Sequence, residues 1–215
     1  MRHEKIFQEL YELVRREMSA GGAHSFDHVE RVLALAERIA REEGADVEVV
    51  RFAALLHDIE RAREDRGEVE CHAIASAERA KRLLLERGVD RRIAERVAEC
   101  IRSHRFRGSA TPQSLEAKVL SDADKLDATG AVGIARAYLF GGKHGQRVWE
   151  EEPKKERFYP GMRAEEYSPR TEYELKLSRL KDRMYTRAGR RIAERRSRFM
   201  KLFFEELERE VKGED

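Results

Sequence analysis

The residues of this 215-residue chain that are best suited to chemistry are His57 and Asp58, at the end of an apolar segment. The spacing of Val50, Ala54 and His57 predicts a helix that turns the imidazole toward a protein core. An ionised carboxylate there is costly to bury without a cation or several hydrogen-bond donors. Imidazole and carboxylate together suit Mn, Fe, Zn or Mg, so the pair is a candidate metal site. An isolated His-Asp pair is more often a hydrogen-bonded core histidine beside a helix-end aspartate. The metal-site interpretation therefore needs further candidate ligands elsewhere in the chain.

Two further segments offer metal-type ligands on apolar faces. His28 begins the apolar stripe of a segment that runs to residue 43. Residues 121–127 hold three aspartates in or at the end of an apolar helix, and the helical period is consistent with either Asp122 or Asp124 pointing inward. Each feature alone is more often a core histidine or a solvated helix end. Three separated segments of the chain thus offer metal-type ligands on faces expected to point inward.

The composition limits the class of protein. Hydrophobic and charged residues each make up 40% of the chain, and 44 basic against 42 acidic residues leave a net charge of +2. This balance argues against a nucleic-acid-binding protein. No apolar run approaches a membrane helix and the N-terminus lacks a signal-peptide core, so we expect a cytoplasmic protein with no membrane partner. Cys71 and Cys100 form no CxxC motif and are expected to be reduced. The absence of Asn and the abundance of Arg and Glu favour a thermophilic source.

The elements that must position these residues are all predicted to be helices, because no stretch alternates with a period of two. Gly44 is expected as a C-cap, and Asp46 and Ser114 as N-caps. Residues 61–67 are expected to form a polar turn, and residues 141–171, rich in Gly and Pro, a long irregular lid or binding loop. The predicted helices cover residues 3–17, 26–43, 47–59, 70–86, 90–104, 115–127, 128–140, 172–185 and 188–211.

Longer motifs in the chain resemble those of the HD superfamily of metal-dependent phosphohydrolases. Residues 24–32, which contain His28, look like the first motif of that family, and residues 53–59 look like the second. Residues 122–136 with Phe140-Gly141-Gly142, and the endings at 176–184 and 199–200, are similar to a branch of small microbial hydrolases. Some members of that branch are nucleoside triphosphate pyrophosphohydrolases. The resemblance covers nearly the whole chain. It implies an HD core over residues 1–140, a loop or lid over 141–171, and C-terminal helices over 172–215 that pack on the same domain.

The resemblance also implies the ligands of the metal. They are His28, His57, Asp58 and, because the family's last ligand follows Ala and precedes a basic residue, Asp124. Mn²⁺ or Mg²⁺ is the expected cofactor, with Co²⁺, Ni²⁺ and Fe²⁺ as alternatives. Asp122 and Asp127 would then orient ligands or donors. His72, His104 and Asp122 are candidates for additional metal or phosphate ligands, with a surface position as the competing interpretation of both histidines.

Other charged residues are assigned to catalysis or substrate binding. Glu60 is a candidate general base beside Asp58, and Lys125 a candidate catalytic cation. Many relatives carry the acid one residue later, where Arg61 stands here. Aromatic residues of the irregular stretch, namely Trp149, Phe158, Tyr159 and Tyr167, either stack on a base or anchor the loop. The candidate phosphate ligands are Arg31, Arg136, Lys143, Lys176 and Lys181.

The expected function is hydrolysis of a nucleotide by a metal-activated water, with a nucleoside triphosphate cleaved to monophosphate and pyrophosphate. A phosphomonoesterase or phosphodiesterase on the same site is the enzymatic alternative. A non-catalytic nucleotide sensor, a helical nucleic-acid binder that uses residues 187–198, and an oxygenase with two irons are rivals from other classes. The exposed length expected for the terminal helices would allow a homodimer.

Overall fold

The structure, a computed structural model, describes residues 2–18, 25–105, 111–151 and 168–214. Regular structure in these ranges is helical throughout, without a strand, which confirms the all-α prediction. None of the helices described there has the length and apolar character needed to span a membrane. The elements are α1 (Arg2–Glu17), α2 (Phe26–Glu43), α3 (Val47–Leu56), α4 (Arg61–Asp65), α5 (His72–Glu86), α6 (Arg91–Arg102), α7 (Leu115–Asp127), α8 (Gly130–Lys143), α9 (Pro169–Leu175), the 3₁₀ helix η2 (Leu177–Arg183) and α10 (Arg187–Lys212).

Local capping sets several helix ends as the sequence predicts. Gly44 ends α2 in the left-handed region at φ 75°, and its N–H bonds the carbonyl of Ala40. The side chain of Asp46 accepts hydrogen bonds from the amides of Glu48 and Val49 and so starts α3. The Ser114 hydroxyl accepts from the amide of Ala117 at the start of α7.

Some predicted boundaries are wrong. Residues 61–65 form the short helix α4 instead of a turn, and α3 stops at Leu56, with His57 as its C-cap. The segment expected as a helix over 172–185 is interrupted at Lys176, where φ is −131°, and continues as η2. The irregular stretch is also shorter than expected at both ends, because α8 runs on to Lys143 and α9 begins at Pro169. Helix α4 was missed because it is short and has no apolar stripe, so its sequence carries no periodic signal.

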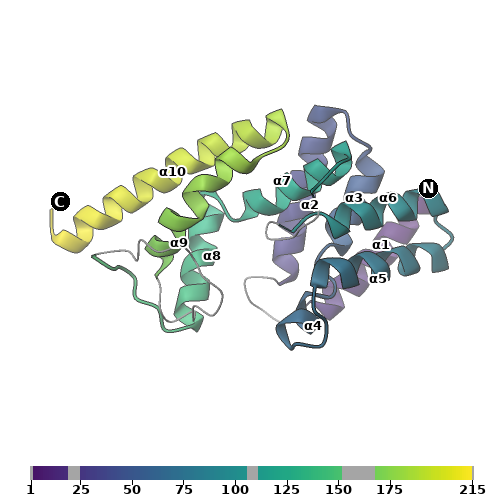
Figure 1. Ribbon diagram of the computed structural model, residues 1–215, viewed down its shortest axis with the longest axis horizontal. Helices are drawn as coiled ribbons and strands as arrows, with labels where there is room; N and C mark the ends of the chain where they lie inside the picture. Colours follow the sequence, from purple (N-terminus) through teal and green to yellow (C-terminus); the bar gives the residue numbers. More distant parts are fainter. Residues whose placement is uncertain (1, 19–24, 106–110, 152–167, 215) are drawn as a thin grey trace. The chain divides into compact units, whose positions relative to one another are not determined.

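The chain folds into two compact units, residues 1–124 and 125–215, and the boundary along the sequence falls within α7. This boundary lies upstream of the one expected at residue 140; the packing of residues 172–215 on the same domain stays a prediction. In the first unit α5 runs alongside α6, and α3 packs against α2 and α6 (Figure 1). The core side chains of this unit that are entirely buried include Val32, Ile39, Leu55, Leu56, Leu84, Ile101 and Leu120.

The second unit is built around α10, which packs against α8 and η2. Its buried face includes Ile192, Ala193, Met200 and Phe204. Close backbone approach is required at Gly133, where an added Cβ would lie 2.4 Å from the carbonyl of Ala128.

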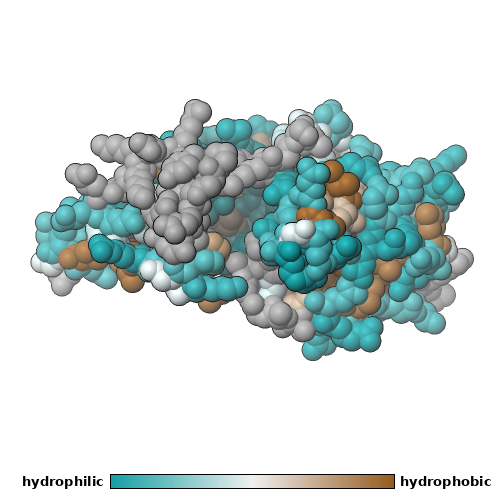
Figure 2. All heavy atoms as spheres, turned by 60° about the horizontal axis from the view of Figure 1, so that its bottom comes forward, coloured by the Kyte–Doolittle hydropathy of each residue, from teal (hydrophilic) through white to brown (hydrophobic). Residues whose placement is uncertain are grey.

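The molecular face drawn in Figure 2 is mostly hydrophilic, with small separate hydrophobic groups, as a chain with 40% charged residues would present.

Candidate metal centre

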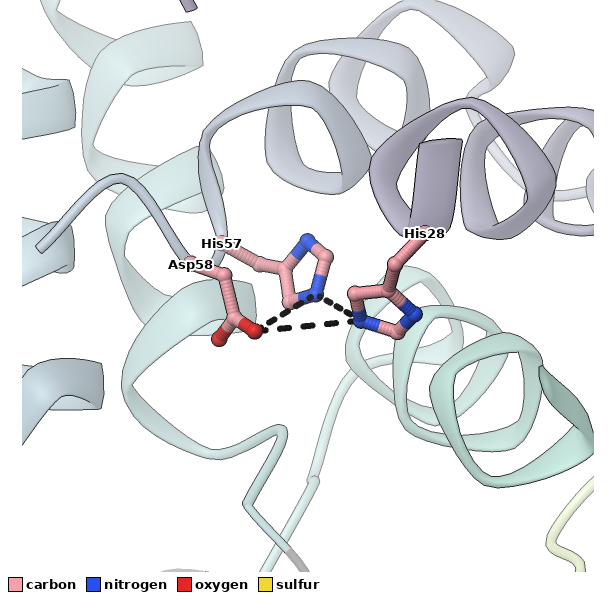
Figure 3. A group of neighbouring side chains, drawn as sticks. All are labelled: His28, His57 and Asp58. Atoms are coloured by element: carbon pink, nitrogen blue, oxygen red, sulfur yellow. Dashed lines mark hydrogen bonds and ion pairs between the residues drawn. The ribbon is translucent and has the colours of Figure 1, made fainter. Parts of the chain in front are cut away.

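Three of the predicted ligands converge in the first unit. His28 lies in the first turn of α2, and His57 and Asp58 follow α3 directly. Nε2 of His57 lies 3.3 Å from Nε2 of His28, and Oδ2 of Asp58 lies 3.7 Å from each of these nitrogens (Figure 3). All three side chains are buried. The atoms therefore face a common point at the spacing that one metal ion requires.

A second group forms on the other oxygen of Asp58. Oδ1 lies 3.2 Å from Nε2 of His72, the first residue of α5, and 3.6 Å from Nε2 of His104, which follows α6. Both histidines are buried, with side-chain exposures of 3%. Their surface interpretation is therefore wrong, and His72, His104 and Asp58 make a second group with metal-ligand geometry. Asp58 belongs to both groups.

Asp124 is the aspartate of α7 whose carboxylate reaches the histidines in the described contacts. Its Oδ1 lies 3.5 Å from Nε2 of His28, and its side chain is 26% exposed. Asp122 is entirely buried. The structure thus brings Asp124, the aspartate that the resemblance selected, to the first group, where its side chain is partly exposed.

Hydrogen bonds to the far ring nitrogens fix the orientation of two imidazoles. Nδ1 of His57 lies 2.8 Å from the carbonyl oxygen of Ala54, and Nδ1 of His104 lies 2.6 Å from that of Ile101. A carbonyl only accepts, so each Nδ1 carries the proton and each Nε2 offers a lone pair to the centre. This tautomer is the one a metal ion needs, and the donor set therefore fits a divalent cation.

Burial and charge act in opposite directions on these histidines. Burial lowers the pKa of His57 to about 4, against the opposing charge of Asp58, so the imidazole is neutral at neutral pH. Burial also lowers the pKa of His104, but the hydrogen bond with Asp58 and the charges of Asp124 and Asp58 raise it to a net value above the usual one. The negative charges of Asp58 and Asp124 thus favour a positive charge at this position.

The predicted base, Glu60, has a different set of contacts. Its side chain is buried, Oε1 accepts from Nη1 of Arg79 at 2.9 Å, and Oε2 accepts from Nη1 of Arg63 at 2.8 Å. Its backbone amide donates to Oγ of Ser76. Both carboxylate oxygens are thus bound by arginines, which is the environment of an ion-pair network and not of a base beside the ligand groups. The role of Glu60 in catalysis stays a prediction that these contacts disfavour.

Most of the predicted phosphate ligands are engaged in ion pairs. Arg31 in the first unit pairs with Asp27 at 2.6 Å. The remaining candidates belong to the second unit, where Arg136 pairs with Asp127 at 2.8 Å and Lys176 pairs with Glu172 at 3.0 Å. Lys143 and Lys181 are exposed. Substrate binding by these five residues stays a prediction.

Two of the other predictions concern the second unit. Nζ of Lys125, a buried residue, lies 4.9 Å from the centroid of the Tyr185 ring, and its catalytic role stays a prediction. The guanidinium of Arg170 lies 3.8 Å from the ring centroid of Trp149, a contact that favours anchoring over base stacking for this indole. Residues His24, Phe158, Tyr159 and Tyr167 lie outside the described residues.

Sequence reasoning missed Glu64 and Arg105, which lie beside the second ligand group. Oε2 of Glu64 is 2.6 Å from Nδ1 of His72, and Oε1 accepts from Nη1 of Arg105 at 2.8 Å. Neither residue has helical spacing to a ligand: Glu64 precedes His72 by eight residues across a turn. The one available signal was the position of Arg105 directly after His104.

Comparison with known proteins places this centre in a family. The HD domain family matches residues 25–129, which include all the ligand candidates. The chain is 36% identical over 196 residues to YpgQ of Bacillus subtilis, covering 89% of this chain and 86% of that protein. A crystal structure of YpgQ in complex with ADP is similar over 98% of this chain and 97% of that one, with a TM-score of 0.76 and 31% identity. An HD-superfamily hydrolase from Bacillus thuringiensis matches over 99% of both chains, with a TM-score of 0.76 and 28% identity.

Proposed function

This chain belongs to the HD-domain family, and from that premise we propose that it hydrolyses nucleotides at a centre where two residue groups that share Asp58 would each hold a divalent metal ion. The observation that carries the proposal is the division of one carboxylate between two histidine groups, with Oδ2 directed at His28 and His57 and Oδ1 directed at His72 and His104. A carboxylate that contacts two ligand groups would hold a metal ion in each of them, as two-metal phosphohydrolases require. Asp124 completes the first position.

The protein side of the reaction follows from burial and orientation. Bound metal ions would activate a water molecule and polarise a phosphoryl oxygen. The fixed rings of His57 and His104 keep the ligand lone pairs aimed at the centre, so no reorganisation is needed during the reaction. Asp124 is 26% exposed whereas His28 is 1% exposed, and the phosphate chain of the substrate therefore approaches from the side of Asp124.

The preferred substrate is a nucleoside triphosphate, cleaved to monophosphate and pyrophosphate. Two observations support a nucleotide: the resemblance along residues 122–142, and the crystal structure of the relative YpgQ in complex with ADP. Mn²⁺ or Mg²⁺ suits a donor set of imidazoles and carboxylates with positions left for water and phosphate oxygen.

The test is hydrolysis of a nucleotide panel by the purified protein with Mn²⁺, Mg²⁺, Co²⁺ or Ni²⁺, with pyrophosphate and orthophosphate measured separately. The expected product is pyrophosphate, formed by the wild type and lost in His57→Ala. His3→Ala is the matched control, because His3 pairs with Glu48 away from the ligand groups. Orthophosphate alone would contradict the proposed cleavage and indicate a phosphomonoesterase. A metal-loaded protein that leaves every nucleotide intact would refute hydrolysis and favour a sensor.

A further inference from the structure

The three histidines whose Nδ1 contacts are given above do not use the same kind of partner. His57 and His104 each donate to the backbone carbonyl three residues earlier in the chain. Nδ1 of His72 instead lies 2.6 Å from a carboxylate oxygen, Oε2 of Glu64. The second ligand group therefore depends on a side chain outside the ligand set.

The helix positions explain this difference. His57 and His104 follow the C-terminal ends of α3 and α6, where the last backbone carbonyls have no intrahelical donor and can accept from a ring N–H. His72 is the first residue of α5, and a helix N-terminus presents free N–H groups instead of carbonyls. An acceptor for Nδ1 of His72 must come from another element, and α4 supplies it with Glu64.

Glu64 is itself held in place. Oε1 accepts from Nη1 of Arg105 at 2.8 Å, and Nη1 of Arg61 lies 3.7 Å from Oε2. The Glu64 side chain is only 15% exposed. One oxygen is thus fixed by an arginine that follows His104, which leaves the other aimed at His72. The carboxylate of Glu64 thus contacts His72 directly and also binds Arg105, the residue that follows His104.

We propose that Glu64 is a positioning residue for the second metal position, the one formed by Asp58, His72 and His104. Its carboxylate accepts the Nδ1 proton of His72, fixes the ring with Nε2 toward Asp58, and makes the imidazole a better electron donor to the metal. The first position, formed by His28, His57, Asp58 and Asp124, does not use this contact. Loss of Glu64 therefore weakens one metal position selectively. This inference rests on the two-metal centre of the proposed function.

Two variants separate orientation from charge. Glu64→Ala removes the acceptor, and Glu64→Gln keeps an acceptor oxygen of the same reach without the charge. The matched control is Glu68→Ala, because Glu68 belongs to the same segment and pairs with Arg63 and Arg66 but not with a ligand. Circular dichroism and thermal unfolding of each metal-free protein show whether the variant is folded.

The experiment is calorimetric titration of the metal-free full chain with Mn²⁺, combined with electron paramagnetic resonance of the loaded protein. The wild type and Glu68→Ala are expected to bind two Mn²⁺ per chain with the spectrum of a coupled pair. In Glu64→Ala we expect the affinity of one position to fall about 10–100-fold, leaving at limiting Mn²⁺ the spectrum of an isolated ion. In Glu64→Gln a smaller loss is expected.

The outcomes distinguish this inference from the proposed function. Two Mn²⁺ bound by folded Glu64→Ala with wild-type affinity would overturn the role of Glu64 and leave the two-metal centre standing. A wild type that binds a single Mn²⁺ would overturn the two-metal centre and this inference with it. Equal weakening of both positions in Glu64→Ala would show a general structural role and would also overturn the selective one.

Discussion

Oδ1 of Asp58 lies 3.2 Å from Nε2 of His72, on the carboxylate edge that the first histidine group does not use. The other oxygen, Oδ2, lies 3.7 Å from Nε2 of His57. Asp58, in the turn after α3, thus contacts histidines of both ligand groups with its two carboxylate oxygens. This position is available because α3 ends at Leu56, and the turn that follows aims consecutive residues at the same point.

The shared carboxylate predicts unequal effects of ligand substitutions. Asp58→Ala should abolish binding at both metal positions, whereas His72→Ala should abolish binding at one. Activity should fall in Asp58→Ala by more than the roughly 10–100-fold typical of residues that only orient a ligand. Metal content after dialysis, measured by mass spectrometry, checks the stoichiometry. Loss of a single ion in Asp58→Ala would contradict the shared use of Asp58 by the two ligand groups.

The buried ring of His57 predicts a pH effect in the metal-free protein. Burial lowers its pKa to about 4, below the value of about 6.5 in an unfolded chain. Between these values the unfolded chain binds a proton that the folded chain does not, so the stability contributed by His57 is present above pH 6.5 and is lost as the pH falls through 4. Nuclear magnetic resonance of the labelled ring should show a midpoint near pH 4. A midpoint near 6.5 in the folded protein would contradict the prediction.

The two arginines on Glu60 predict a structural effect of its substitution. Glu60→Gln removes a buried charge that Arg63 and Arg79 both bind, and the free energy of unfolding should fall by about 1–3 kcal/mol. Turnover should change less than about tenfold, because a true general base is worth about 10²–10⁴. Denaturant unfolding and steady-state kinetics on the same sample separate the two effects. A large loss of kcat without loss of stability would restore the catalytic assignment.

The parts of the fold that the sequence predicts are those with a local cause. The bounds of α2 and α7 follow from apolar periodicity, and the start of α3 follows from the cap at Asp46. The break at Lys176 was missed, because the pattern of apolar residues continues through it while the backbone leaves the helical region at φ −131°.

The candidate site also contains residues that a local pattern predicts and residues that it does not. His28, His57 and Asp58 were predictable because each lies on, or directly after, an apolar helical stripe. The choice between Asp122 and Asp124 was not predictable from period alone, because α7 is buried on nearly all sides and so has no single inward face. Glu64 reaches His72 across a turn, and only tertiary structure brings the two residues together.

The close approach at Gly133 predicts a loss of stability without any change in the metal ligands. A Cβ at this position would lie 2.4 Å from the backbone of Ala128, and backbone cannot move aside as a flexible side chain can. Gly133→Ala should lower the free energy of unfolding by about 1–3 kcal/mol. Gly142→Ala is the matched control: it lies in the same helix, a Cβ there meets nothing within 4 Å, and the gain in helix propensity should stabilise it by up to about 1 kcal/mol. Thermal and denaturant unfolding measure both changes. Equal stability of the two variants would contradict the close packing of α8 on the residues that precede it.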